Sequence, residues 1–349
     1  MPNIAPHEAL YGNLPLDQLP LVTLYLTERC NSRCVTCDYW RHGRLDMSLE
    51  KVQELLPDLL RLRTRTVLIS GGEPLLNKEW AAIASLLKDS GMQLWLLTSG
   101  LSLAKHVVAV SGLFDAVTVS LDGADATTYA AIRGVDAFDK VCEGIRLATA
   151  AGLPVGVRVT VQRANYRQLP DFVRLVRRLG ARQLSFVAVD VANPHAFART
   201  DQIGAALSLD PSDLPELGRI LSNLERDHDA EFRSGFIAEK PQKLRRIQQY
   251  FSAVCGLGSY PPVRCNAPEF SAVIDARGRV NPCFFIPGPA AVAGQEDLEA
   301  VLNHQPMIAL RADIREGARA ECARCVCSLW REPGSRTPGD FSLSARANV

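Results

Sequence analysis

Three cysteines lie close together in the segment LTERCNSRCVTCDYWR, residues 26–41. They are Cys30, Cys34 and Cys37, with the spacing C-x3-C-x2-C. Thiolates bind zinc and iron–sulfur clusters, so this spacing predicts a metal centre. A structural zinc ion takes four ligands, and His42 is available as the fourth. The alternative is a [4Fe-4S] cluster on three thiolates, which leaves one iron open to a substrate or cofactor.

Seven further cysteines include a second group of six toward the C-terminus. They are Cys142 and, in the second group, Cys255, Cys265, Cys283, Cys322, Cys325 and Cys327, which with the first three make ten. The N-terminus has no basic start followed by an apolar run, so the sequence predicts no secretory signal. We therefore expect a cytoplasmic protein. In that reducing compartment, ten cysteines in one chain indicate metal binding or redox chemistry rather than disulfides.

Two short polar segments carry further candidate binding residues. SGGEPLL offers Gly71 and Gly72 for close backbone approach to a ligand, and Glu73 as a carboxylate for an ammonium group. The alternative for this segment is a strand-to-helix turn. In SLDGADATTYAAIRG, Ser120 and Asp122 are suited to hydrogen bonds with a sugar hydroxyl. The alternative for this segment is a helix cap.

Strand and helix patterns alternate along the first half of the chain, and each candidate segment follows a strand. Apolar, β-branched runs predict six strands, each followed by a helix or helical loop, at residues 21–27, 65–70, 93–99, 116–122, 155–161 and 183–189. This order predicts an α/β fold, a partial (β/α)6 TIM-like barrel with a parallel sheet. Such barrels carry their chemistry at the C-terminal strand ends, so the first cysteine group falls on the active face.

The pattern changes after about residue 200. Charged helical segments fill residues 207–250, and SAVIDARGRVNPC predicts a hairpin whose turn uses Gly278 for a positive φ. We expect five regions, namely an N-terminal extension (1–19), the barrel (20–205), a helical connector (206–254), a small cysteine-rich domain (255–330) and a flexible tail (331–349).

The composition argues against several classes of partner. A formal net charge of +1 gives no global reason to expect nucleic acid or an anionic membrane. No stretch reaches the roughly 18 unbroken apolar residues of a membrane span. Apolar residues make up 47% of the chain and charged residues 22%, as in ordinary globular proteins.

Together, these motifs resemble the radical S-adenosylmethionine (SAM) enzymes. C-x3-C-x2-C follows the first strand, Gly-Gly-Glu-Pro the second and Ser-Leu-Asp-Gly the fourth, a combination far more specific than any one member. In that family the amino and carboxylate groups of SAM chelate the open iron of a [4Fe-4S] cluster. An electron from the reduced cluster cleaves SAM to methionine and a 5′-deoxyadenosyl radical, which abstracts a hydrogen atom from the substrate.

The resemblance implies roles for individual residues. Cys30, Cys34 and Cys37 would bind the cluster. The residues implied in SAM binding are Gly71, Gly72, Glu73 and Pro74 at the methionine end, Ser120 and Asp122 at the ribose, and Arg158 at the carboxylate. For Arg158, an ion pair at the barrel rim is the alternative. The family often has an aromatic residue just before the third cysteine, where this chain has Thr36, so Tyr39 or Trp40 is expected to stack on the adenine.

The second cysteine group resembles the SPASM and twitch extensions of the same family. Cys265 and Cys283 are separated by seventeen residues, and Cys322 and Cys325 by two. Similarity to the butirosin-type alcohol dehydrogenase implies these four as ligands of one auxiliary [4Fe-4S] cluster, with Cys327 as a replacement for Cys325. Full SPASM domains bind two auxiliary clusters with seven or more cysteines, which this group does not reach. A zinc knuckle on the same four residues is the alternative.

The fate of the substrate radical separates the functional hypotheses. In the first, the enzyme is an oxidoreductase or epimerase for a sugar or aminocyclitol, and the radical is oxidised through the auxiliary cluster or quenched by Cys255 or Cys327 as hydrogen-atom donor. In the second, it matures a ribosomal peptide by crosslinking or epimerisation. A non-catalytic metal-binding protein is a third hypothesis, against which the assembled motifs argue.

The partners follow from these hypotheses. Only about twenty residues precede the first strand, too few for a leader-binding winged-helix module, although a separate protein could supply one. We therefore expect a small-molecule substrate rather than a peptide. A flavodoxin or ferredoxin is the expected reductant.

Overall fold

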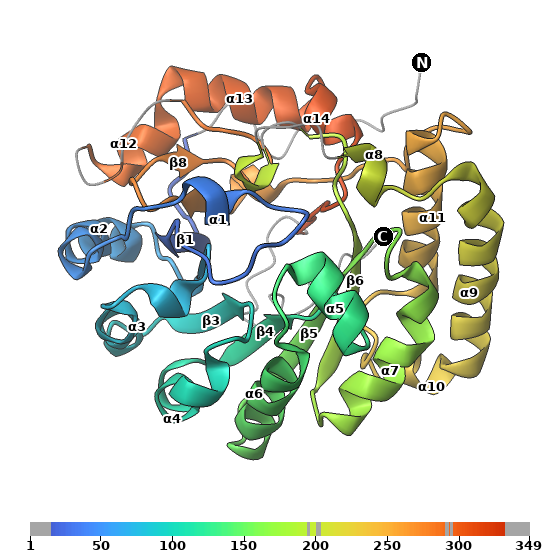
Figure 1. Ribbon diagram of the computed structural model, residues 1–349. Coiled ribbons are helices and arrows are strands. Elements are labelled where there is room, and N and C mark those ends of the chain that lie inside the picture. Colours follow the sequence, from blue (N-terminus) through green and yellow to red (C-terminus); the bar gives the residue numbers. More distant parts are fainter. Residues whose placement is uncertain (1–14, 194–195, 200–203, 290–292, 294–295, 332–349) are drawn as a thin grey trace.

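The computed structural model describes residues 15–193, 196–199, 204–289, 293 and 296–331. At its centre lies one sheet of eight strands (Figure 1). The strands are β1 (Leu21–Thr27), β2 (Thr66–Gly71), β3 (Gln93–Thr98), β4 (Ala116–Ser120), β5 (Val155–Val161), β6 (Gln183–Ala188), β7 (Ser271–Ile274) and β8 (Val280–Asn281).

The strands lie side by side in the order β6-β5-β4-β3-β2-β1-β7-β8. Every neighbouring pair from β6 to β7 is parallel, and β7 and β8 are antiparallel. The six strands expected from the sequence are confirmed. Within the described residues the sheet is open, because β6 and β8 form its two ends and do not pair with each other.

Helices follow the strands and cover the outer face of the sheet (Figure 1). They are α1 (Tyr39–His42), α2 (Leu49–Arg61), α3 (Trp80–Asp89), α4 (Leu103–Leu113), α5 (Ala126–Arg133), α6 (Phe138–Ala150), α7 (Leu169–Arg178), α8 (Gly204–Leu207), α9 (Leu214–Asp227), α10 (Asp229–Arg233), α11 (Pro241–Val254), α12 (Leu298–Asn303), α13 (Gln305–Arg315) and α14 (Ala320–Ala323). In α2, for example, the Ser48 side chain caps the first turn by accepting from Lys51 N at 3.2 Å.

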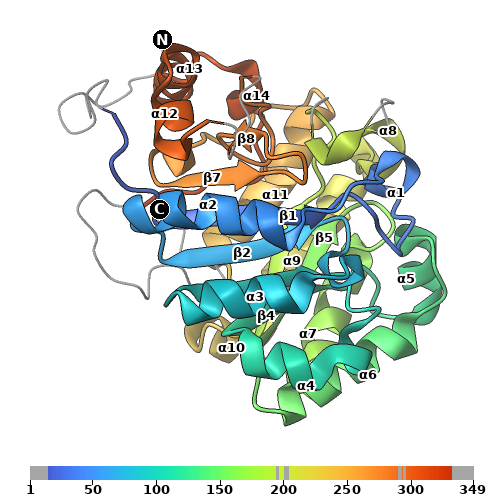
Figure 2. The same ribbon diagram turned by 90° about the vertical axis from the view of Figure 1, so that its left-hand side faces the viewer.

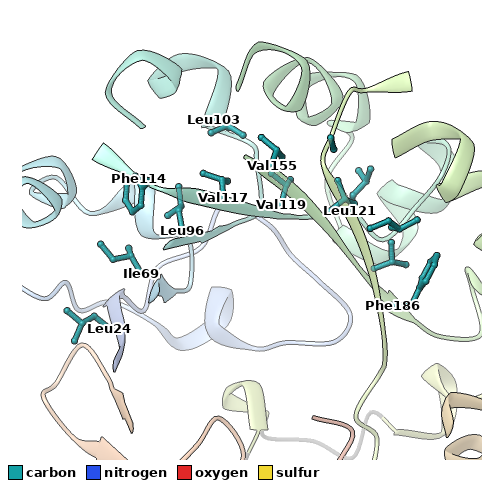
Figure 3. Close-up of a cluster of buried hydrophobic side chains, with 14 of the residues drawn as sticks. Leu24, Ile69, Leu96, Leu103, Phe114, Val117, Val119, Leu121, Val155 and Phe186 are labelled. Atoms are coloured by element: carbon teal, nitrogen blue, oxygen red, sulfur yellow. The ribbon is translucent and has the colours of Figure 1, made fainter. Parts of the chain in front are cut away.

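Alternation along the strands gives the sheet two different faces. On β1, Val22, Leu24 and Leu26 are fully buried, whereas Tyr25 points to the opposite face and is only partly buried. Figure 3 shows the buried layer between strands and helices, with Leu24 among the labelled side chains. The opposite, inner face is the one on which the strands present polar residues such as Ser120.

The expected hairpin is present but belongs to the main sheet. β7 and β8 are antiparallel, and Gly278 in their turn has a φ of 84°. β7 also pairs in parallel with β1, with Leu21 opposite Ser271 and Leu24 opposite Ile274. Figure 2 shows β7 running beside β1. The cysteine-rich region is therefore joined to the first barrel strand by main-chain hydrogen bonds, a connection that the sequence did not predict.

The terminal regions are only partly described. Residues 1–14 of the expected extension and 332–349 of the expected tail lie outside the described residues. Leu16 is held at the end of α12, where its N and O bond to the Asn303 side chain at 2.7 and 2.9 Å. Across the part of the chain that is described, no helix combines the length and apolar character needed to cross a membrane.

Candidate active site and auxiliary cluster site

The first cysteine group lies on the loop between β1 and α1, at the C-terminal ends of the parallel strands. Burial raises the pKa of Cys30 to about 11 and that of Cys37 to about 12. Cys34 adds to the rise in both, and Cys30 adds to the rise in Cys37, so the three thiols converge. Such thiols stay protonated until a metal centre displaces their protons. The donors therefore suit a three-thiolate cluster. The side chain of His42, the alternative fourth ligand, lies outside what the structure describes.

The C-terminal end of α5 supports this loop. Arg33 N donates to Arg133 O at 2.9 Å, and Val35 N donates to Ile132 O at 3.0 Å. Gly134 ends the helix with a φ of 67°, and a Cβ atom there would lie 2.3 Å from Arg33 O. Glycine is required at this position because the loop passes directly against the helix end.

The Gly-Gly-Glu-Pro segment contacts the beginning of the same loop. Gly72 N donates to Thr27 O at 2.7 Å, and Glu73 N donates to Arg29 O at 2.8 Å. Gly71 has a φ of 127°, and a Cβ atom on Gly72 would lie 2.2 Å from Arg29 O. The two glycines thus allow one backbone to approach another. Their close approach to a ligand stays a prediction.

The Glu73 side chain is fully buried and turned toward the end of β3. Its Oε1 accepts from Thr98 Oγ1 at 2.8 Å, and its Oε2 accepts from Ser99 N at 2.7 Å and Ser99 Oγ at 2.6 Å. The sequence suggests an ammonium partner for this carboxylate, but in the structure these hydrogen bonds occupy it. Glu73 therefore positions the ends of β2 and β3, while Pro74 begins the short 3-10 helix Pro74–Leu76.

Asp122 is occupied in a similar way. Its Oδ2 accepts from Arg133 Nη1 at 3.0 Å, and its Oδ1 accepts from Thr160 N at 2.7 Å. Only 1% of Asp122 is exposed. In the structure this carboxylate ties β4, α5 and β5 together, rather than facing outward as the expected ribose contact would require.

Ser120 and Arg158 are cross-strand neighbours at the inner face. The register of β4 and β5 places them opposite each other, and both are partly buried. The Nε of Arg158 is buried and has no hydrogen-bond partner among the described residues. Their contacts with SAM stay predictions, and the unpaired nitrogen of Arg158 is suited to an anion.

Tyr39 and Trp40 flank the cysteine loop. The Tyr39 ring meets the Tyr25 ring edge-on, with centroids 6.0 Å apart. Trp40 Nε1 donates to Cys34 O at 3.4 Å. Both aromatic residues thus lie beside the first cysteine group, and stacking of either on adenine stays a prediction.

Five of the six C-terminal cysteines converge in a second site. Cys265 lies before β7, Cys283 follows β8, Cys322 lies in α14, and Cys325 and Cys327 follow α14. Burial raises the pKa of the first four, to about 12 for Cys283 and about 11 for Cys322. For each of these four cysteines, at least one other cysteine of the group also raises the pKa.

Cys325 and Cys327, the two candidates for the fourth ligand of the auxiliary cluster, differ in exposure. Cys327 is exposed, and its N donates to Cys325 Sγ at 3.3 Å, whereas Cys325 is partly buried. Among the described residues, no three His, Cys, Asp or Glu side chains are grouped closely enough to hold a single metal ion. Four thiols drawn from separate segments suit a larger centre, an iron–sulfur cluster.

Cys255 lies apart from both groups. It follows α11, its Sγ donates to Leu209 O at 3.2 Å, and Asp210 and Asp213 add to the rise in pKa that burial causes. These described contacts bring it to neither cysteine group. Its role as a spare ligand or hydrogen-atom donor stays a prediction without geometric support.

Tyr25 lies between the two sites and was not identified from the sequence. Its ring stacks on Phe284 with centroids 6.4 Å apart, and it also meets the Tyr39 ring edge-on. After burial and Tyr39, Cys37 and Cys283 are the next causes that raise its pKa. The sequence signal was present in LVTLYLT, where an aromatic residue takes an inward position near the end of an aliphatic strand.

Two partly buried arginines beside the first cysteine group were also missed. Arg133 is the last residue but one of the SLDGADATTYAAIRG segment, of which only the beginning was interpreted. Arg199 Nε donates to Thr36 O at 3.1 Å, and burial lowers the pKa of Arg199 although Cys37 opposes this. The adjacent Phe197 has a φ of 61°, and its O accepts from Asp38 N at 3.0 Å.

Sequence comparisons agree with this geometry. The profile of the radical SAM superfamily matches residues 24–176, and that of the SPASM iron–sulfur cluster-binding domain matches residues 265–326. Pre-heme d1 synthase of Dinoroseobacter shibae is 32% identical over 164 residues, 45% of this chain and 40% of the relative. A probable GTP 3′,8-cyclase of Saccharolobus solfataricus is 31% identical over 179 residues, 50% of this chain and 57% of the relative. The chain spans about half the length of these relatives.

Solved structures share the fold. SuiB of Streptococcus suis bound to its precursor peptide SuiA superposes with a TM-score of 0.65 at 15% identity, over 90% of this chain and 72% of SuiB. Native anSMEcpe with bound AdoMet and a peptide gives 0.61 at 18% identity, over 82% of this chain and 81% of that chain. With Cys30, Cys34 and Cys37 inside the first matched region and Cys265, Cys283, Cys322 and Cys325 inside the second, the chain belongs to the radical SAM superfamily, with a SAM-bound [4Fe-4S] cluster and a C-terminal SPASM domain for auxiliary iron–sulfur chemistry.

Proposed function

We propose that this radical SAM enzyme oxidises a sugar or aminocyclitol by removing a hydrogen atom from carbon. The observation that carries the proposal is the position of Tyr25, whose ring contacts join the surroundings of Cys37 to those of Cys283. Each cysteine group thus has one member, Cys37 or Cys283, close enough to Tyr25 to influence its pKa. A radical formed beside the first site is near an electron acceptor at the second.

The ligand sets follow from the converging thiols. Cys30, Cys34 and Cys37 hold the SAM cluster, and Cys265, Cys283, Cys322 and Cys325 hold one auxiliary [4Fe-4S] cluster. When bound, these groups supply one-electron cleavage of SAM and a one-electron acceptor for the substrate radical. A flavodoxin or ferredoxin supplies the reducing electron.

The protein's own residues bind and orient. Gly71 and Gly72 bring the second strand end against the cysteine loop, and Glu73 fixes that strand end to β3. Ser120 and Arg158 lie on the inner face, where a hydroxyl and an unpaired guanidinium nitrogen suit the ribose and carboxylate of SAM.

Epimerisation is the alternative outcome at the same site. It requires a thiol that returns a hydrogen atom to the substrate radical. Cys327 is exposed beside Cys325, so it is the better placed of the two candidate donors, and Cys255 contacts Leu209 instead.

A peptide substrate is the second candidate. Val35, Phe197 and Phe284 are among the large apolar side chains that are more than one-third exposed. Val35 lies in the cysteine loop, Phe197 contacts Asp38 in that loop through its carbonyl, and Phe284 stacks on Tyr25. An apolar rim of this kind favours a substrate with apolar side chains. SuiB and anSMEcpe, which share the fold, have been solved with peptides.

The test uses the full chain, reconstituted anaerobically with iron and sulfide and reduced with dithionite in deuterated water. Panels of aminocyclitols, sugars and synthetic peptides are screened for substrate-dependent release of 5′-deoxyadenosine. We expect an aminocyclitol or sugar to stimulate release and to give a two-electron-oxidised product without deuterium at carbon.

Each other outcome has a definite meaning. A product of unchanged oxidation state that carries deuterium at carbon identifies an epimerase and overturns the oxidation proposal. Stimulation by peptides alone overturns the small-molecule proposal. If dithionite and SAM yield no 5′-deoxyadenosine with any panel, the proposed activity fails as a whole.

A further inference from the structure

The cysteine loop, residues 30–37, has an outer side that faces solvent. Arg33 is exposed, whereas its neighbour Ser32 is fully buried and Cys34 is partly buried. Figure 2 shows α1, which follows the loop, and α5, which supports it, on the same side of the molecule. A protein that docks on this outer side comes within one loop of the three thiols.

The contacts of α1 extend the outer side of the loop. Trp40 Nε1 donates to Cys34 O at 3.4 Å, and the guanidinium of Arg41 lies over the Trp40 ring, 4.6 Å from its centroid. Arg44 Nη2 donates in turn to Arg41 O at 3.4 Å. Both Arg41 and Arg44 are exposed. Arg33, Trp40, Arg41 and Arg44 together are called the basic surface below.

This part of the chain carries an excess of positive charge. Ion pairs take up all three carboxylates of residues 28–46, namely Glu28 with Arg277 at 2.9 Å, Asp38 with Arg41 at 3.0 Å and Asp46 with Arg29 at 2.5 Å. Arg33 and Arg44 form no ion pair within the described part of the chain. The Arg44 guanidinium contacts only carbonyl oxygens, which leave its charge in place. Two exposed cations are thus in excess beside the cysteine loop, although the whole chain has a formal net charge of only +1.

We propose that the basic surface docks an acidic one-electron carrier protein, of the flavodoxin or ferredoxin class, which reduces the cluster on Cys30, Cys34 and Cys37. In each transfer the carrier loses one electron and the cluster gains one, and no bond forms or breaks. Excess cations steer an acidic partner and raise its association rate, and salt removes this effect. Redox encounters bury little surface, so a few charges strongly influence their rates.

The inference rests on the proposed ligand set but needs no substrate, so the experiment is carried out with SAM alone. The full chain is reconstituted anaerobically with iron and sulfide. Release of 5′-deoxyadenosine is measured with limiting reduced flavodoxin, with limiting reduced ferredoxin, and with excess dithionite. Binding is measured separately, by surface plasmon resonance on immobilised oxidised flavodoxin and ferredoxin. Each measurement is made at low ionic strength and at ~1 M salt, where the Debye length is about 3 Å.

The test variant combines Arg33→Gln with Arg44→Gln. At low ionic strength we expect the carrier-driven rate and the association rate constant to fall about tenfold, and about threefold in each single variant. In ~1 M salt the difference from the wild type should disappear. Release driven by excess dithionite should be unchanged, because the thiols are untouched. The double variant with Arg33→Lys and Arg44→Lys keeps both charges and should behave like the wild type.

Arg178→Gln is the matched control. Arg178 is exposed and lies in the last turn of α7, which leads into the start of β6. The cysteine loop follows the opposite, C-terminal end of the parallel strands. Removal of this charge alters the net charge of the protein by one but leaves the basic surface intact, so the carrier-driven rate should stay within about twofold of the wild type.

The remaining outcomes overturn the proposal. They are equal slowing in the glutamine double variant and Arg178→Gln, slowing that persists in ~1 M salt, and failure of both carriers to bind or to drive release in the wild type. If the glutamine double variant loses iron, the lysine double variant decides, and slowing there rejects docking by charge. If even dithionite gives no release in the wild type, the ligand set fails, and the binding data alone decide the docking surface.

Discussion

The two cysteine sites are built in opposite ways. The first takes three thiols from one loop of eight residues, Cys30 to Cys37, and the rest of the fold supports that loop through α5 and the end of β2. The second collects its thiols from three segments, before β7, after β8, and in or after α14. A local site can be recognised from spacing, whereas a dispersed site exists only after the chain has folded.

The electrostatic settings also differ. Burial raises the thiol pKa at both sites, but only the first has Arg133 opposing the rise at all three cysteines. At the second, Arg319 opposes the rise at Cys322. The first site therefore combines a compact ligand loop with a partly buried arginine.

The largest effect is expected from substitutions that remove a ligand from one site and leave the other site intact. Cys34→Ala should abolish release of 5′-deoxyadenosine, because the cluster loses one of three ligands. Cys283→Ala should retain release in the presence of dithionite and SAM, since its cluster does not bind SAM. Chromatography measures release, and iron analysis should show a fall from about eight to about four irons per chain in either variant.

Cys327→Ala is the control for this comparison. Its thiol is exposed, so we expect the full iron content, whereas Cys325→Ala should lose the auxiliary cluster. Equal loss of 5′-deoxyadenosine release in Cys34→Ala and Cys283→Ala would contradict the separation of the two sites. If Cys327→Ala loses iron and Cys325→Ala does not, Cys327 rather than Cys325 is the fourth ligand of the auxiliary cluster.

An intermediate effect concerns the support of the first site. Gly134→Ala and Gly152→Ala both place alanine at a positive φ after a helix, which costs about 1–2 kcal/mol of stability. At Gly152 an added Cβ meets nothing within 4 Å, whereas at Gly134 it meets Arg33 O at 2.3 Å. We expect Gly134→Ala to lose about 1–3 kcal/mol more in the free energy of unfolding.

Urea titration of the iron-free chains measures both stabilities. Reconstitution then gives a second comparison, because displacement of the loop at Arg33 should lower iron loading at the first site in Gly134→Ala and leave Gly152→Ala unchanged. Equal losses of stability and loading in the two variants would show that α5 does not support the cysteine loop.

The smallest expected effect concerns the link between the two sites. Glu28, just after β1, forms an ion pair with Arg277 of the hairpin turn at 2.9 Å. Burial raises the pKa of Glu28, but hydrogen bonds from Arg44 N and Arg277 outweigh it and lower the pKa overall. A carboxyl of lowered pKa stabilises the fold above its usual pKa of 4.5, and this contribution is lost as the pH falls through the lowered value.

Thermal unfolding of the iron-free chain measures this contribution. Glu28→Gln should lower Tm slightly near neutral pH, and the difference from the wild type should disappear as the pH falls through the lowered pKa of Glu28. Glu54→Gln, at the exposed ion pair with Lys51, is the control and should change Tm little. If the Tm difference between Glu28→Gln and the wild type grows in acid, the prediction that ionised Glu28 stabilises the fold is contradicted.

The sequence predicted the strands because their information is local. Alternating apolar residues mark each strand, and the structure confirms all six. The expected strand 116–122 ends at Ser120, because Asp122 turns its side chain to Thr160 N. The helical run 125–150 is two helices, because Gly134 takes a left-handed conformation between them.

The loops of the candidate site could be predicted from the sequence, whereas the residues that support these loops could not. The cysteine spacing and the strand-end motifs identified the right loops. The partners of Glu73 and Asp122 could not be predicted, because Ser99 and Arg133 come from other segments and reach these carboxylates only in the folded chain. Nor does any local pattern indicate that β7 pairs with β1, or that Tyr25 consequently lies between the sites.

The pairing of β1 with β7 also has a consequence for biosynthesis. Leu21 pairs with Ser271, so one edge of the first strand waits for a partner made about 250 residues later. At roughly 5–20 residues per second, the growing chain carries an unpaired strand edge for about 12–50 s, a period in which it can associate with other chains. Production of this protein should therefore respond to growth temperature and to chaperones that shield nascent chains.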